Sequence, residues 1–213
     1  MADTILTQIL DEPPVRKREI LRYAGAPIDS AEFDDLIDEC IKLMLPGLSY
    51  KVCYRKFPVT FKTQENGSVL IDLGFTKTLS PSLLLNLKGC KEIILFAGTI
   101  GLYPDRLIER YGRLSPSKAL FFQAFGAERI EALCDAFMDK IRLELNESEK
   151  LRPRFSPGYG GFELSVQKDI FGVLDPPTKI GVTLNDSLLM SPSKSVTALI
   201  GIERTPADLE RSI

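Results

Sequence analysis

Residues 154 to 162 read Arg-Phe-Ser-Pro-Gly-Tyr-Gly-Gly-Phe, and no other stretch of the chain is as informative. Pro157 fixes one φ angle, while three glycines allow φ above zero and leave backbone amides uncovered by side chains. Arg154 can donate two hydrogen bonds to a carboxylate, and Tyr159 or Phe162 can lie against a ring or a cation. Two interpretations stay open: a small-molecule site, or a surface loop whose aromatic side chains anchor it to the core.

The chain contains no histidine. This excludes a Ser-His-Asp or Cys-His catalytic arrangement, a metal site with a histidine ligand, and a histidine as the lower axial ligand of a corrin cobalt. The four cysteines are scattered, without metal-ligand spacing, and each lies in or beside an apolar segment. We expect reduced core thiols at Cys40, Cys53, Cys90 and Cys134.

The composition is that of a globular protein with a sizeable core. The chain has 213 residues, of which 44% are hydrophobic and 26% charged. Its 27 basic and 29 acidic residues give a net charge of -2 without long blocks of one sign, so neither nucleic acid nor a membrane is an expected partner. No apolar run approaches the ~20 residues that span a bilayer, and the N-terminus lacks the regions of a signal peptide. We expect a cytoplasmic protein.

The first half of the chain predicts two helices followed by strands. A short helix over 16–24 ends at Gly25, and a longer one begins at Asp29 with a capping box and runs to Pro46. We therefore expect an N-terminal helical segment, 1–46, packed on a main domain, 47–213. Alternation over 49–61 and 68–73 predicts a hairpin, and the apolar run 92–97 predicts a strand buried on both faces.

The second half of the chain predicts helices, then strands. Gly98-Thr99-Ile100-Gly101 follows a strand as a phosphate loop does, but GxGxxG and a Walker lysine are missing, so a tight turn is the default. The proline and glycine positions and the apolar spacing predict the later elements. These are helices over 104–111, closed by Gly112, over 116–145 with a joint at Gly126, and over 165–174, then β-compatible segments at 180–190 and 196–202.

Three motifs together resemble a known family. Arg-Phe-Ser-Pro-Gly-Tyr at 154–159, Ile-Gly-Val-Thr-Leu-Asn-Asp-Ser-Leu-Leu-Met-Ser-Pro at 180–192 and Ser-Val-Thr at 195–197 resemble the activation (reactivation) domain of cobalamin-dependent methionine synthase. The resemblance covers 114–202 most convincingly. It implies an α+β fold, a twisted antiparallel sheet flanked by helices, that binds S-adenosylmethionine and offers its methyl group to a cobalamin carried by a partner.

The resemblance also implies the residues of the ligand site. The family's arginine falls on Arg154, where it would grip the methionine carboxylate, and Ser156, Gly158 and Tyr159 match the turn beside the ligand. The family's glutamate from the preceding long helix aligns with Glu131. One helical turn of error in that alignment would replace Glu131 by Asp135.

Two departures separate this chain from the full-length members of that family. Gly160-Gly161-Phe162 stands where those members have a Pro-Ala-Cys-Pro-like segment followed by an acidic-His pair. The family's tyrosine-bearing extension toward the corrin has no counterpart after Ile202. These departures motivate an alternative interpretation, in which the chain keeps the fold but no longer binds S-adenosylmethionine.

The resemblance leads to one main expectation about function. The chain is expected to be the activation subunit of a split cobalamin-dependent methionine synthase, a methyltransferase of methionine biosynthesis, and inactive alone. Its expected partners are a cobalamin-binding subunit or corrinoid protein and a flavodoxin or ferredoxin-like electron donor. Two alternatives stay open: a non-catalytic scaffold for corrinoid proteins that no longer binds S-adenosylmethionine, and a free-standing methyltransferase with a small acceptor.

Overall fold

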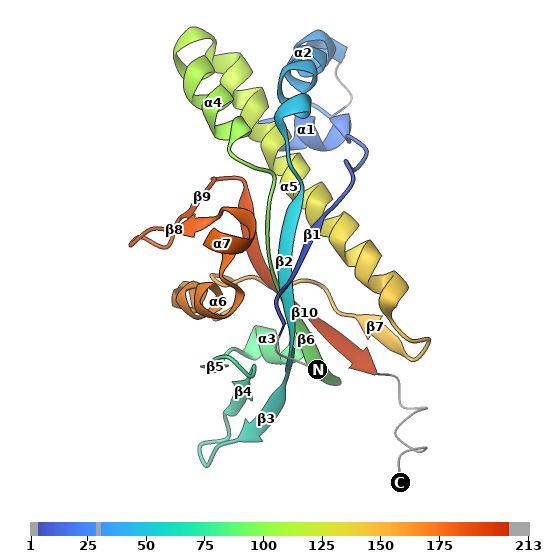
Figure 1. Ribbon diagram of the computed structural model, residues 1–213, viewed down its shortest axis with the longest axis vertical. Coiled ribbons are helices and arrows are strands. Elements are labelled where there is room, and N and C mark those ends of the chain that lie inside the picture. Colours follow the sequence, from blue (N-terminus) through green and yellow to red (C-terminus); the bar gives the residue numbers. More distant parts are fainter. Residues whose placement is uncertain (1–3, 29–30, 205–213) are drawn as a thin grey trace.

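A five-stranded antiparallel sheet forms the centre of the protein, described by a computed structural model over residues 4–28 and 31–204 (Figure 1). In spatial order its strands are β1 (Leu6–Ile9), β2 (Lys51–Pro58), β6 (Cys90–Thr99), β10 (Ser195–Arg204) and β7 (Glu149–Leu151). Strand β6 pairs with both neighbours over nearly its whole length, with Thr99 opposite Lys51 and Ser195. Its residues from Ile93 on are buried, as expected of a central strand covered on both faces. The expected α+β fold with an antiparallel sheet and flanking helices is confirmed.

One face of the sheet is covered by the long helix α5 (Pro116–Glu144), which crosses the strands diagonally (Figure 1). Leu133 and Phe137 of α5 pack on Tyr54 of β2 and Phe96 of β6, as their helical spacing predicts. The expected joint at Gly126 is wrong, because α5 continues through it. A Cβ there would lie 2.7 Å from Cε of Lys194, so the glycine gives room for that side chain to cross the helix.

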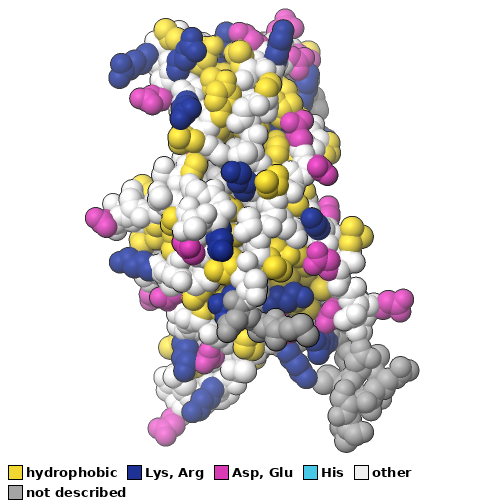
Figure 2. All heavy atoms as spheres, in the orientation of Figure 1, with side chains coloured by type: hydrophobic (Ala, Val, Ile, Leu, Met, Phe, Trp, Pro, Cys, Tyr) yellow, Lys and Arg dark blue, Asp and Glu magenta, His cyan; other side chains and the backbone are white. Residues whose placement is uncertain are grey.

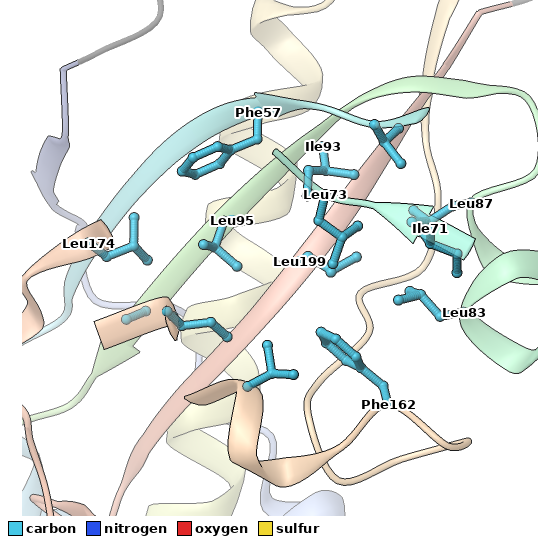
Figure 3. Close-up of a cluster of buried hydrophobic side chains, with 14 of the residues drawn as sticks. Phe57, Ile71, Leu73, Leu83, Leu87, Ile93, Leu95, Phe162, Leu174 and Leu199 are labelled. Atoms are coloured by element: carbon cyan, nitrogen blue, oxygen red, sulfur yellow. The ribbon is translucent and has the colours of Figure 1, made fainter. Parts of the chain in front are cut away.

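The opposite face of the sheet carries smaller elements. They are α3 (Pro81–Asn86), α6 (Gln167–Leu174), α7 (Pro176–Ile180) and the strands β3 (Thr60–Thr63), β4 (Val69–Asp72) and β5 (Lys77–Thr78). Figure 3 shows the core between these layers, where Phe162 points from its loop toward Leu83 and Leu199. The predicted hairpin is formed by β3 and β4, whereas β2 belongs to the main sheet.

A third apolar cluster lies at one end of the molecule, around the first half of α5. There α1 (Lys17–Ala24), α2 (Asp34–Met44) and α4 (Tyr103–Leu114) pack on Phe122 and Phe125. Helix α1 ends at Gly25 with φ 70, as predicted. The expected capping box begins at Asp29, which lies outside the described residues, and α4 runs through Gly112 rather than ending there.

The last third of the chain differs from the expected pattern in two places. Helix α6 ends at Leu174 as predicted, with Asp175 in a left-handed conformation, φ 46°, but the prolines after it begin a further short helix, α7. Within 180–190 only β8 (Thr183–Leu184) and one residue of β9 (Met190–Ser191) are extended strands. Ile180, at the end of α7, and Val182 pack in the core, whereas Leu189 is 63% exposed, so the hydrophobicity of this segment did not indicate strands.

The surface charges and the cysteines agree with what the sequence composition predicts. Figure 2 shows Lys and Arg side chains interspersed with Asp and Glu over the visible face, without a large block of one sign. Within the described residues, no helix is both long and apolar enough to cross a bilayer. All four cysteines are buried and free, which confirms the expectation of reduced core thiols.

Candidate functional site

Arg154 lies on a segment that continues the sheet beyond β7. The next residue, Phe155, exchanges backbone hydrogen bonds of 2.9 Å with Leu199 of β10, so this short stretch is extended. Successive side chains of extended backbone point to opposite faces of a sheet. Phe155 accordingly packs in the cluster beside α3 and α6, while Arg154 reaches α5 on the other face.

Helix α5 presents both predicted carboxylates to Arg154. Nη2 of Arg154 donates to Oε2 of Glu131, and Nη1 donates to Oδ1 of Asp135 at 3.0 Å. The two acidic residues lie one helical turn apart, on the same side of the helix, so a single guanidinium can bind both. Burial opposes the charged form of Arg154, but the surrounding acidic groups, Cys134, Glu131 and Asp135, outweigh it and raise its pKa. The guanidinium is therefore a permanent cation with internal partners.

A hollow of about 530 Å³ opens beside this ion-pair cluster. Its size falls within the usual range for sites of small molecules and cofactors. The lining combines charge and apolar surface, with four charged and three apolar residues. They are Asp135, Arg142, Arg152 and Arg154, then Met138, Leu151 and Pro153. A ligand with an anionic group and an apolar body suits such a lining.

The glycine-rich turn that follows Arg154 faces the opposite layer. The Gly158 amide donates to the Phe162 carbonyl at 2.7 Å, and Ser80 at the start of α3 donates through Oγ to the Gly160 carbonyl at 2.7 Å. The side chain of Phe162 is 1% exposed, so this aromatic ring anchors the loop to the core, whereas Tyr159 is 71% exposed. For Phe162, the interpretation as an anchored surface loop is the correct one.

The predicted site residues therefore fall into two groups. Arg154 and Glu131 are in direct contact, and Asp135, the alternative to Glu131, joins them. Gly158 and Tyr159 lie in the turn, and Ser156 precedes it. None of these last three lines the hollow beside Arg154.

Sequence reasoning missed a second cluster of charges on α5. Glu128 and Arg129 are both fully buried, and Nε and Nη2 of Arg129 donate to Glu128 at 2.5 and 2.6 Å. Arg129 also donates to the backbone carbonyls of Pro13 and Pro14, at 2.6 and 2.8 Å. These bonds fasten the segment before α1 onto α5. Within the described residues, no group of His, Cys, Asp or Glu is arranged to hold a metal ion.

The turn at 98–101 is short and closed by its own side chains. Gly101 has φ 88, its amide donates to Oγ1 of Thr99 at 3.1 Å, and an added Cβ would lie 2.7 Å from Oγ of Ser49. This geometry is that of the tight turn taken as the default.

Comparison with known proteins gives one type of match. No family model matches the sequence, and no curated protein matches it. Among solved structures, the chain is similar to a crystal structure of the MetH reactivation domain bound to AdoHcy, with a TM-score of 0.64 and 14% sequence identity. The match covers 93% of this chain and 78% of the other. At this identity the likeness establishes a shared fold, the fold that the three sequence motifs indicated.

Proposed function

We propose that this chain is an S-adenosylmethionine-binding activation module that supplies the methyl group for reductive remethylation of a cobalamin on a partner methionine synthase or related corrinoid protein. The observation that carries the proposal is the similarity, over 93% of the chain, to a reactivation domain bound to AdoHcy. AdoHcy is what remains of S-adenosylmethionine after methyl transfer. The cobalamin of the partner would supply the nucleophilic cobalt, which explains why a histidine-free chain needs no general base.

The cluster around Arg154 supports a site for the amino-acid end of this ligand. Arg154 can bind the methionine carboxylate, and Glu131 can accept from the α-ammonium group. In the described structure these two side chains bind each other. Ligand binding therefore exchanges an internal ion pair for two pairs with the zwitterion, beside a hollow of about 530 Å³ that can take the rest of the molecule.

Calorimetric titration with AdoHcy and with S-adenosylmethionine tests the proposal. Arg154→Ala should lower the affinity about tenfold, near the lower end of the 1.5–3 kcal/mol expected of a charge-assisted bond, because the guanidinium also has internal partners. Arg113→Ala, an exposed arginine in the last turn of α4, is the matched control and should bind as the wild type does. Unchanged affinity in Arg154→Ala would remove Arg154 from the site.

A second candidate function is a scaffold for corrinoid proteins that no longer binds S-adenosylmethionine. The internal neutralisation of Arg154 by Glu131 and Asp135 favours it. The absence of any heat or thermal shift at millimolar ligand would support the scaffold and refute the methyl-donor role. Under either function, a corrinoid partner should co-purify, and its visible absorption band identifies it.

A further inference from the structure

Asp135 is shared between two arginines that lie far apart in the sequence, Arg16 and Arg154. Its Oδ1 accepts from Nη1 of Arg154 at 3.0 Å, and its Oδ2 accepts from Nη1 of Arg16 at 3.1 Å. Asp135 also lines two hollows, the one beside Arg154 and another of about 280 Å³ beside Arg16. The carboxylate thus connects the segment before α1 with the proposed ligand site.

The sharing has an electrostatic consequence. The two guanidinium groups on this one carboxylate repel each other, so each lowers the net stabilisation that the other gains there. The side chains of Arg16 and Asp135 are 43% and 47% exposed, so water screens this effect without abolishing it at contact distance. Arg16 therefore makes it easier for Arg154 to leave Asp135.

We propose that Arg16 is a positioning residue of the S-adenosylmethionine site, acting through Asp135 on Arg154. The inference rests on the proposed function. A ligand carboxylate that binds Arg154 must displace the Asp135 side chain from it. Asp135 then keeps Arg16 as its partner. Without Arg16, Asp135 would hold Arg154 more tightly and would lose its remaining partner when the ligand binds.

The position of Arg16 does not depend on its contact with Asp135. Its backbone amide donates to Oε1 of Glu128 at 3.2 Å, and its Nε approaches the same oxygen at 3.2 Å. Two residues earlier, the carbonyl of Pro14 accepts from buried Arg129. The hydrogen bonds of the Arg16 amide and the Pro14 carbonyl do not need the Arg16 side chain, so they keep the segment on α5 in the variants. The Nε contact with Glu128 is lost in Arg16→Ala, and the Asp135→Asn background separates that loss from the effect of the charge on Asp135.

A double-mutant cycle tests the inference with AdoHcy as the titrated ligand. Arg16→Ala should weaken binding about two- to fivefold, the range for a half-exposed ion pair, and Arg16→Lys, which keeps the cation, should retain most of the affinity. In an Asp135→Asn background, the same Arg16→Ala change should have no effect. Lys17→Ala is the matched control: this neighbouring cation pairs with Asp38 of α2, away from the site, and its loss should leave the affinity unchanged.

The outcomes separate this inference from the proposed function. An Arg16→Ala effect that persists in Asp135→Asn would mean a structural role through Glu128 and would overturn the inference, as would the absence of any effect in the wild-type background. Lack of AdoHcy affinity in the wild type would overturn the proposed function and this inference with it. Should Arg16→Ala lower the melting temperature below the assay range, Arg16→Gln, closer in length, completes the same cycle.

Discussion

The buried ion pair between Glu128 and Arg129 holds the segment before α1 on helix α5, and its substitution has a predictable effect on stability. Both side chains have no exposed surface, and the guanidinium is bound by one carboxylate and two backbone carbonyls. A buried pair adds little to stability over apolar residues of the same volume, but removing one partner strands a buried charge, which costs about 3–5 kcal/mol. In Arg129→Met, the buried Glu128 carboxylate keeps the backbone amide and the half-exposed Nε of Arg16 as partners. We therefore expect Arg129→Met to be strongly destabilised.

Arg129→Met should lower the melting temperature by about 6–20 °C, because 1 kcal/mol corresponds to about 2–4 °C for a chain of this size. In Glu128→Leu/Arg129→Met the stranded carboxylate is gone as well. This double variant should be more stable than Arg129→Met by about 1 kcal/mol or more. Arg142→Ala, on the same helix, removes a pair with Asp139 whose side chains are 52% and 70% exposed, and should change stability by less than about 0.5 kcal/mol.

Urea unfolding followed by circular dichroism measures all three variants on one scale, provided that the slope with denaturant is unchanged. Two results would refute the reasoning. One is an Arg129→Met variant that loses no more stability than Arg142→Ala does. The other is a double variant that is less stable than Arg129→Met, which would mean that the contacts of Glu128 with Arg16 are enough to stabilise this buried carboxylate without Arg129.

Two further predictions concern the loop and the thiols. Phe162→Ala should destabilise the protein by about 3–5 kcal/mol in urea unfolding, because Phe162 is 1% exposed. Tyr159 is 71% exposed, so Tyr159→Ala should change stability by less than about 0.5 kcal/mol. Equal losses would mean that Phe162 does not anchor the loop. Burial raises the pKa of every cysteine, to about 11 or about 12, so no thiol should react with Ellman's reagent at pH 8 until the protein is unfolded. Unfolded thiols ionise from about pH 8.5, so above that pH the unfolded state binds fewer protons than the folded state, and stability should fall as the pH rises further. Rapid labelling of the folded protein would contradict both the raised pKa values and this loss of stability.

The elements predicted best from sequence are those whose burial pattern is simple. Strand β6 is an uninterrupted apolar run because helices and small strands cover both of its faces, and α5 carries a stripe at helical spacing because one side packs on the sheet. Each of these patterns lies within one continuous segment of sequence, because each element packs against one large apolar surface.

Elements that depend on distant partners could not be predicted in this way. Strand β1 has Leu6 and Ile9 48% and 75% exposed, and only its pairing with β2 makes it a strand. Gly126 is a residue that weakens helices, and its neighbour Lys194 comes from a segment far along the chain. Glu128 and Arg129 are adjacent on a helix, where successive side chains do not normally face each other, so their pairing through the N-terminal segment left no pattern in the sequence.

The candidate site illustrates the same division between local and distant information. The family resemblance predicted Glu131, or Asp135 one helical turn on, as the acidic residue of the site, whereas the contact of both with Arg154 follows from where Phe155 pairs with β10. That contact changes the physics expected of the site. An arginine already bound to two carboxylates gains little from a third, so the affinity for a carboxylate ligand must depend on what the released carboxylates bind next. A zwitterion can satisfy Glu131 through its ammonium group, and Arg16 can satisfy Asp135, whereas a simple carboxylic acid leaves Glu131 without a partner.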